Sequence, residues 1–142
     1  MDTQGKTARF GDYQQEGGII MEHVEEFTSD GKNIIYIDFS RAVSEKDFNA
    51  VIEQVKQVMP KYAEKSVCTL TNMENVRFDS RIKNIFVKFV EFNKPYVKYG
   101  AAIGMDGIKK KMSEGILKLG GRPDFHFCFT KEEALKWLRQ QP

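Results

Sequence analysis

An aspartate and a serine stand side by side at Asp79-Ser80, and three basic residues lie close to them in the sequence, Arg77, Arg81 and Lys83. Side-chain oxygens of Asp and Ser accept hydrogen bonds from the free amides at the start of a helix. A phosphate group on Ser80 would also meet those amides, the positive end of the helix dipole and the three cations. The stretch therefore predicts either a plain helix cap or a phosphorylation switch at Ser80 that Asp79 helps to orient.

Histidine and cysteine are too few and too scattered to predict a metal or catalytic site. His23 and His126 lie far apart in the sequence, and neither His-x-x-x-His nor Cys-x-x-Cys spacing occurs. Cys68 and Cys128 stand in apolar runs, where a free cysteine behaves as a small hydrophobic residue. His126 and Cys128 would share one face of a strand, yet no third group that could orient them is evident. We therefore predict a non-enzymatic protein with no metal and no cofactor.

Aromatic residues raise an alternative function, that of a small-molecule or lipid-binding module. Phe78 lies directly before Asp79, and Tyr96 and Tyr99 belong to a later apolar run. Ligand sites in open parallel sheets collect at the carboxyl ends of the strands, so these three side chains could line an apolar pocket there. Burial in the core is the simpler explanation, because each buried aromatic side chain stabilises the fold by about 1.5–3 kcal/mol. Both interpretations stay open.

Three consecutive lysines, Lys109 to Lys111, make one stretch of the chain basic. Ile108, Met112 and Ile116 recur beside them with helical spacing and would form the buried stripe of a helix. The lysines then spread over the solvated side of that helix. Binding of an anionic ligand or of a membrane surface is the less favoured interpretation.

Length and composition predict one soluble globular domain. The chain has 142 residues, of which 41% are hydrophobic and 30% are charged, so it can bury a sizeable core. A net charge of +2 is too small to favour a nucleic-acid partner. No run approaches the roughly 18 apolar residues of a membrane span, and the polar start of the chain does not resemble a signal peptide. We expect a cytoplasmic protein that is not an integral membrane protein.

Hydrophobic periodicity predicts strands that alternate with helices, behind a flexible N-terminal arm of residues 1–18. Asp30-Gly31 is a strong signal for a hairpin between the first two strands. Helix starts are marked by Ser44 and by Thr130, the latter with Glu133 three positions later. The predicted strands are Ile19–Phe27, Asn33–Phe39, Val67–Thr71, Tyr96–Gly104 and Phe125–Phe129, and a helix follows each strand after the first.

The resulting order is β-β-α-β-α-β-α-β-α. Strands that alternate with helices indicate parallel pairing with right-handed crossovers, and the opening hairpin adds an antiparallel strand. We therefore predict an α/β fold, a mixed and mainly parallel five-stranded sheet with four helices, in a single domain over residues 19–140.

This order, together with a Val-x-Phe-Asp-Ser stretch at 76–80 after the third strand, resembles the STAS domain of bacterial anti-sigma-factor antagonists. The likeness extends over roughly residues 19–140. The stretches 69–71, 77–80 and 93–97 and the capped last helix are similar to the divergent STAS-like (SpoIIAA-like) bacterial proteins. The chain departs from the antagonists after Ser80, where Arg81-Ile82-Lys83 replaces their usual Ser/Thr, Gly and Leu.

The resemblance implies a regulatory module that binds other proteins. In STAS antagonists the serine that matches Ser80 is phosphorylated by a partner kinase, which controls binding to that partner. By this likeness the expected partner is a kinase or another anti-sigma-like regulator, with a second copy of the chain in a homodimer as a further option. Arg77, Arg81 and Lys83 would then contact the phosphate or the partner.

Overall fold

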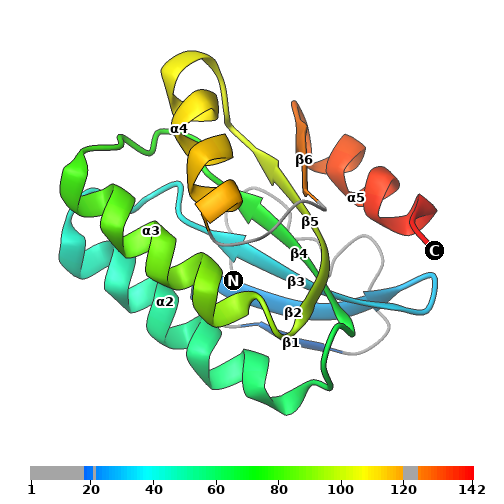
Figure 1. The fold of residues 1–142 in the computed structure, drawn as a ribbon. Coiled ribbons are helices and arrows are strands. Elements are labelled where there is room, and N and C mark those ends of the chain that lie inside the picture. Colours follow the sequence, from blue (N-terminus) through cyan, green and yellow to red (C-terminus); the bar gives the residue numbers. More distant parts are fainter. Residues whose placement is uncertain (1–17, 21, 120–124) are drawn as a thin grey trace, which may run out of the picture.

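The computed structural model describes residues 18–20, 22–119 and 125–142. In these ranges one six-stranded sheet carries its strands in sequence order, with helices against both of its faces (Figure 1). The strands are β1 (Gly18–Ile20), β2 (Val24–Ser29), β3 (Lys32–Asp38), β4 (Val67–Asn72), β5 (Val97–Ile103) and β6 (Phe125–Cys128). The helices are α2 (Glu45–Val58), α3 (Ser80–Asn93), α4 (Gly107–Leu119) and α5 (Lys131–Gln140), and a short 3-10 helix, η1 (Met59–Lys61), follows α2.

The predicted order of elements, β-β-α-β-α-β-α-β-α, is confirmed from β2 to α5. All pairs from β3 to β6 are parallel, and β2 pairs antiparallel with β3. The sheet has one strand more than predicted, because the run Ile19–Phe27 is divided. A bend at Glu22 and His23 lets β1 fold back on β2, with Gly18 opposite Phe27. Apart from Gly18, the predicted arm lies outside the described residues.

Turn and cap residues act as their types predict. Asp30 and Gly31 have φ angles of 51° and 75°, the left-handed conformation that a two-residue hairpin turn requires. Ser44 accepts a hydrogen bond from the Asp47 amide at 3.2 Å and so caps the start of α2. Thr130 caps α5 in the same way. These local signals fix where the strands turn and where the helices begin.

The two faces of the sheet bury different side chains. Helices α2, α3 and α4 cover one face, here called the three-helix face, and α5 covers the opposite α5 face. Successive residues of a strand point to opposite faces. In β4, Leu70 packs with the α5 core, whereas Thr69 and Thr71 face the three helices.

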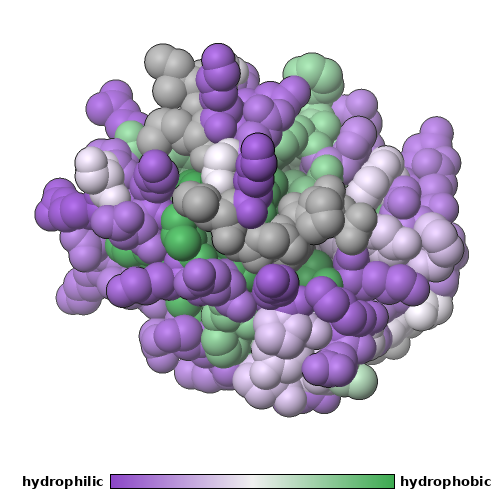
Figure 2. All heavy atoms as spheres, viewed as in Figure 1, coloured by the Kyte–Doolittle hydropathy of each residue, from purple (hydrophilic) through white to green (hydrophobic). Residues whose placement is uncertain are grey.

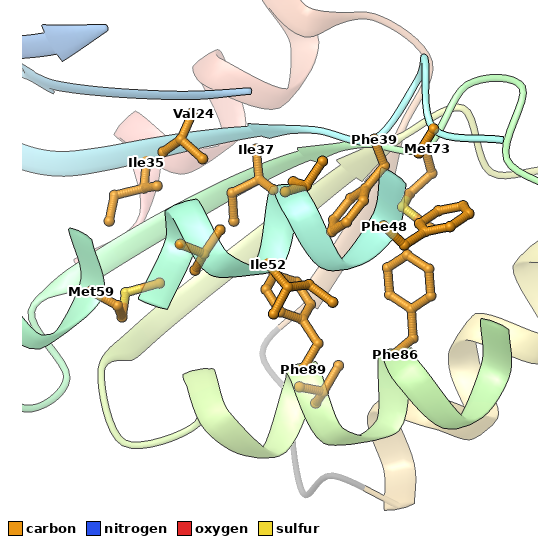
Figure 3. Packing of buried hydrophobic residues seen from close by; sticks show 14 of the residues in the cluster. Val24, Ile35, Ile37, Phe39, Phe48, Ile52, Met59, Met73, Phe86 and Phe89 are labelled. Atoms are coloured by element: carbon orange, nitrogen blue, oxygen red, sulfur yellow. The ribbon is translucent and has the colours of Figure 1, made fainter. Parts of the chain in front are cut away.

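A cluster of phenylalanine rings packs together within the mostly aliphatic core of the three-helix face (Figure 3). The Phe39 ring lies edge-on to Phe86 and Phe89, with centroid distances of 4.9 Å and 5.4 Å. Phe48 from α2 stacks against Phe39 at 5.8 Å. Such pairs add about 0.5–1.5 kcal/mol each beyond the area they bury. This cluster anchors α3 to the sheet and to α2.

The α5 face has a smaller core. Ala134, Leu135 and Leu138 of α5 are buried against strands β3 to β5. Arg139 also donates a 2.8 Å hydrogen bond to the Ser29 hydroxyl in the hairpin, which ties the end of α5 to β2. In the described part of the chain, no helix combines the length and the apolar character needed to cross a membrane.

Candidate functional site

The first candidate region is the start of α3, at the carboxyl edge of the sheet. The loop after β4 leads to Asp79, whose carboxylate accepts a 2.9 Å hydrogen bond from the Ile82 amide. Asp79 is therefore the N-cap of α3, which confirms the prediction of a helix cap in this stretch. Ser80 is the first residue of the helix itself, and both it and Asp79 are exposed.

Positive charge surrounds the exposed Ser80. Arg77, Arg81 and Lys83 are all exposed, and no acidic residue lies in the first turn of α3. Arg81 forms an ion pair with Glu45 of α2, at 3.4 Å between Nη1 and Oε2, and 77% of its side chain is exposed. An ion pair that is so exposed to solvent contributes little to stability, so Arg81 is free to exchange Glu45 for another anion. All five predicted residues of this stretch are thus exposed.

The loop before Ser80 is fixed by the neighbouring loop between β5 and α4. The Met73 amide donates to the Ile103 carbonyl at 2.9 Å, and Lys109 Nζ donates to the Met73 carbonyl at 3.0 Å. Gly104, with a φ angle of +80°, lies so close that an added Cβ would be 2.3 Å from the Glu74 nitrogen. Only glycine fits this approach. The loop is thus held firmly although Ser80 is exposed.

A buried polar pair supports the same loop from the α5 face. The Asn72 side chain donates to the Tyr36 hydroxyl at 3.0 Å and accepts from the Glu74 amide at 3.0 Å. Burial, together with the nearby Asp38 carboxylate, raises the pKa of Tyr36 well above its usual value, so the hydroxyl stays neutral. No sequence pattern predicted this pair, because Tyr36 and Asn72 are brought together only by the pairing of β3 with β4.

The basic stretch in α4 is partly used within the protein. Lys109 holds the Met73 carbonyl, and Lys110 Nζ lies 5.7 Å from the centroid of the Phe127 ring. Lys111 is exposed. The side chains of Ile108 and Met112 lie outside the described residues, while Ile116 is buried as the helical spacing predicts.

The second candidate region is a cavity of about 50 Å³ between α3, α4 and strands β4 to β6. Phe78 lines it, as the pocket hypothesis expects. Its other walls are aromatic and aliphatic, apart from three polar residues, Thr69, Thr71 and Asn93. The cavity therefore combines an apolar wall with a small polar region.

Tyr96 and Tyr99, the other predicted pocket residues, do not line this cavity. Tyr96 is half-buried on the three-helix face, with its ring 6.0 Å from that of Phe92. Tyr99 lies on the α5 face, where it packs edge-on against Trp137 at 6.2 Å. The sheet itself separates Tyr99 from Phe78, because alternate residues of β5 point to opposite sides.

Asn93 is the residue of the cavity that sequence reasoning missed. The sequence indicates that Asn93 ends the second helix, and α3 does end there. The residue is also only 3% exposed, and its Oδ1 atom has no hydrogen-bond partner in the described part of the chain. The spacing of the helix could have revealed its burial. Asn93 follows Phe86, Phe89 and Val90 at helical spacing, so it belongs to the buried stripe of the helix.

The histidines and cysteines do not gather into a cluster of metal ligands in the ranges that the structure describes. No group of three or more metal-ligating side chains occurs among those residues. Burial raises the pKa of the Cys68 and Cys128 thiols, which opposes formation of the reactive thiolate. The exposed His126 stacks on Trp137 with ring centroids 4.8 Å apart. The contact between His126 and Trp137 joins β6 to α5.

Comparison with known proteins shows the fold. No family model matches the chain, and no curated protein matches it. The NMR structure of the protein TM1081 is similar to it, with a TM-score of 0.50 and 12% identity, covering 99% of this chain and 100% of that one. An anti-sigma-factor antagonist (STAS) domain protein from Planctomyces limnophilus has a TM-score of 0.49 and 16% identity, covering 81% of this chain and 97% of that one. The likeness to TM1081 shows a shared fold.

Proposed function

We propose that the chain is a non-enzymatic regulatory module that binds a protein partner and that phosphorylation of Ser80 switches this binding. The observation that carries the proposal is the division of roles between two neighbours. Asp79 caps α3, so the Ser80 hydroxyl is exposed at the helix start and has no capping task. A hydroxyl in that place can be modified without removing the cap.

A phosphate on Ser80 would change the local charge strongly. It adds about −1.5 to −2 charges at pH 7, at the positive end of the α3 dipole. Arg77 and Lys83 are exposed nearby, and Arg81 could exchange its ion pair with Glu45 for one with the phosphate. The modification would therefore change a basic surface into a neutral or acidic one without unfolding the helix.

Exposed hydrophobic residues at the same edge of the sheet support a protein partner. Val43 and Phe129 are 89% and 88% exposed, and they are the large hydrophobic side chains that the described structure leaves in solvent. Val43 follows β3, Ser80 follows β4 and Phe129 follows β6, so all three lie at the carboxyl edge of the parallel strands. Exposed apolar anchors beside charged residues are typical of partner surfaces. The expected partner is a kinase or an anti-sigma-like regulator.

Quantitative affinity capture from the organism's own extract tests the switch. The baits are the wild-type chain, Ser80→Ala, Ser80→Asp and, as a control, Asn84→Asp. Asn84 is an exposed residue one turn further along α3, so its replacement adds the same charge away from the helix start. We expect one partner to be retained by wild type, Ser80→Ala and Asn84→Asp, and to bind Ser80→Asp about tenfold less. Equal capture by Ser80→Asp and the wild type would contradict the switch.

A second pair of variants tests where that partner binds. Val43→Ser and Phe129→Ser remove the exposed anchors, and neither side chain contributes to the core. We expect weaker capture of the same partner with an unchanged free energy of unfolding. If both variants bind that partner as the wild type does, the partner surface lies elsewhere.

A further inference from the structure

The cavity on the three-helix face is large enough to hold more than one water molecule. Its volume is about 50 Å³, several times the roughly 10–15 Å³ that one water needs. It lies in the core between α3, α4 and the strands, in a region otherwise filled by aromatic rings. Among the residues that the structure describes, no charged one lines it. This wall suits an uncharged occupant, because an unpaired ion would not leave water for such surroundings.

One polar group in this wall lacks a partner. Asn93 is 3% exposed, and its Oδ1 has no hydrogen-bond partner in the residues that the structure describes. A buried polar atom without a partner destabilises the fold. Thr69 and Thr71 also line the cavity and add two more polar side chains. The wall is thus mostly apolar, and at one place the Asn93 Oδ1 atom can still accept a hydrogen bond.

We propose that this cavity binds a small uncharged molecule with an apolar body and one hydroxyl group, and that Asn93 recognises the hydroxyl. A hydroxyl both donates and accepts hydrogen bonds, so it satisfies either end of the Asn93 amide. The aromatic and aliphatic part of the wall suits an apolar body, which water lacks. The proposal is independent of the Ser80 switch.

Entry to the cavity is available along its half-buried wall. Phe78, Met105 and Phe127 line the cavity and are only partly buried. On the face shown in Figure 2, hydrophobic side chains reach the surface over α3 among hydrophilic ones. Phe78 precedes the cap of α3, so an occupied cavity would lie directly behind the loop that carries Ser80.

Two probe molecules of nearly equal shape test the proposal, ethanol and propane, which differ by a hydroxyl in place of a methyl group and are small enough for a cavity of about 50 Å³. The full chain, labelled with ¹⁵N and with ¹³C at its methyl groups, is titrated with each probe and followed by NMR. We expect both to bind, with shift changes centred on Val90, Ile116 and Leu117, and ethanol to bind about tenfold more tightly, as one hydrogen bond provides. The side-chain amide signals of Asn93 should move with ethanol and stay in place with propane.

Two leucine variants separate the amide from the shape of the cavity. Asn93→Leu should reduce the preference for ethanol over propane to about onefold, while Asn84→Leu, on the exposed side of the same helix, should leave it unchanged. Absence of binding by both probes, equal affinities in the wild type, or a preference that survives Asn93→Leu would each overturn the proposal. If Asn93→Leu does not fold, the wild-type affinities and the Asn93 amide signals still decide it.

Discussion

The two ends of α3 place polar side chains in opposite surroundings. At its start, Ser80 is exposed among cations at the edge of the sheet. At its end, Asn93 is buried beside the cavity and has an oxygen without a partner in the described structure. Water satisfies an exposed polar group, whereas a buried one needs a partner from the protein or from a ligand. The first end is therefore suited to modification and partner contact, and the second to recognition of a small molecule.

The largest expected effect concerns the loop that fixes the exposed end. Gly104→Ala should lower the free energy of unfolding by about 3 kcal/mol or more, because the new Cβ meets the Glu74 backbone and the backbone is strained at positive φ. Gly31→Ala is the control, since φ is also positive there but no atom lies within 4 Å. It should cost only about 1–2 kcal/mol. Urea denaturation followed by circular dichroism measures both, and equal losses would contradict the tight contact.

The next effect tests the buried end through two adjacent alanines of β5. Ala102 lines the cavity, whereas Ala101 is fully buried in the core of the α5 face. Ala101→Val should destabilise the fold by about 1–3 kcal/mol through overpacking, while Ala102→Val should change stability by less than about 1 kcal/mol because it enters free space. Thermal denaturation of the two variants gives the comparison. A larger loss for Ala102→Val would mean that the cavity is closed in solution.

A smaller difference separates the two neighbours at the start of α3. Asp79→Ala should lower the free energy of unfolding by about 1 kcal/mol, because the Ile82 amide loses its acceptor. Ser80→Ala should stay within about 0.5 kcal/mol of the wild type, as expected of an exposed side chain without a structural task. Urea denaturation distinguishes these values. If Ser80→Ala lowered stability more than Asp79→Ala, Ser80 rather than Asp79 would be the residue that caps α3.

The smallest expected effect is a pH dependence of the free energy of unfolding that comes from the start of α2. This helix start is capped, as that of α3 is, and so allows a comparison between the two. A hydrogen bond from the Val43 amide, with others from Ser44, holds the pKa of Asp47 below its usual value. The ionised form is thus favoured by folding, so its contribution is complete above the usual pKa of 3.8 and is lost as the pH falls through the lower folded value. Asp47→Asn should flatten the fall of stability in this acidic range. An identical pH profile for variant and wild type would exclude the contribution.

Local sequence signals predicted the hairpin turn, the helix starts and the exposed start of α3. Asp30-Gly31, the caps at Ser44 and Thr130 and the position of Asp79 each depend on a few neighbouring residues, and the structure confirms them. The strand β1 was merged with β2, because no turn residue separates them as clearly as Asp30-Gly31 separates β2 from β3.

The buried end was harder to predict because it depends on contacts between distant segments. Phe78 was correctly placed near the strand ends, but its neighbours in the cavity come from α4 and β6 rather than from Tyr96 and Tyr99. Asn93 was interpreted only as a helix stop, since a sequence does not show whether a buried amide finds a partner. The support of the Ser80 loop by Tyr36 and Asn72 likewise requires the sheet register.

The mass of the full chain, purified from the organism in which it occurs, tests the central claim most directly. Intact-protein mass spectrometry followed by peptide mapping would show whether a phosphate is attached and to which residue. The account predicts a fraction of molecules that is heavier by one phosphate, mapped to Ser80 and absent from Ser80→Ala. A chain that remains unmodified under all growth conditions, or a phosphate mapped to another residue, would contradict the switch at Ser80.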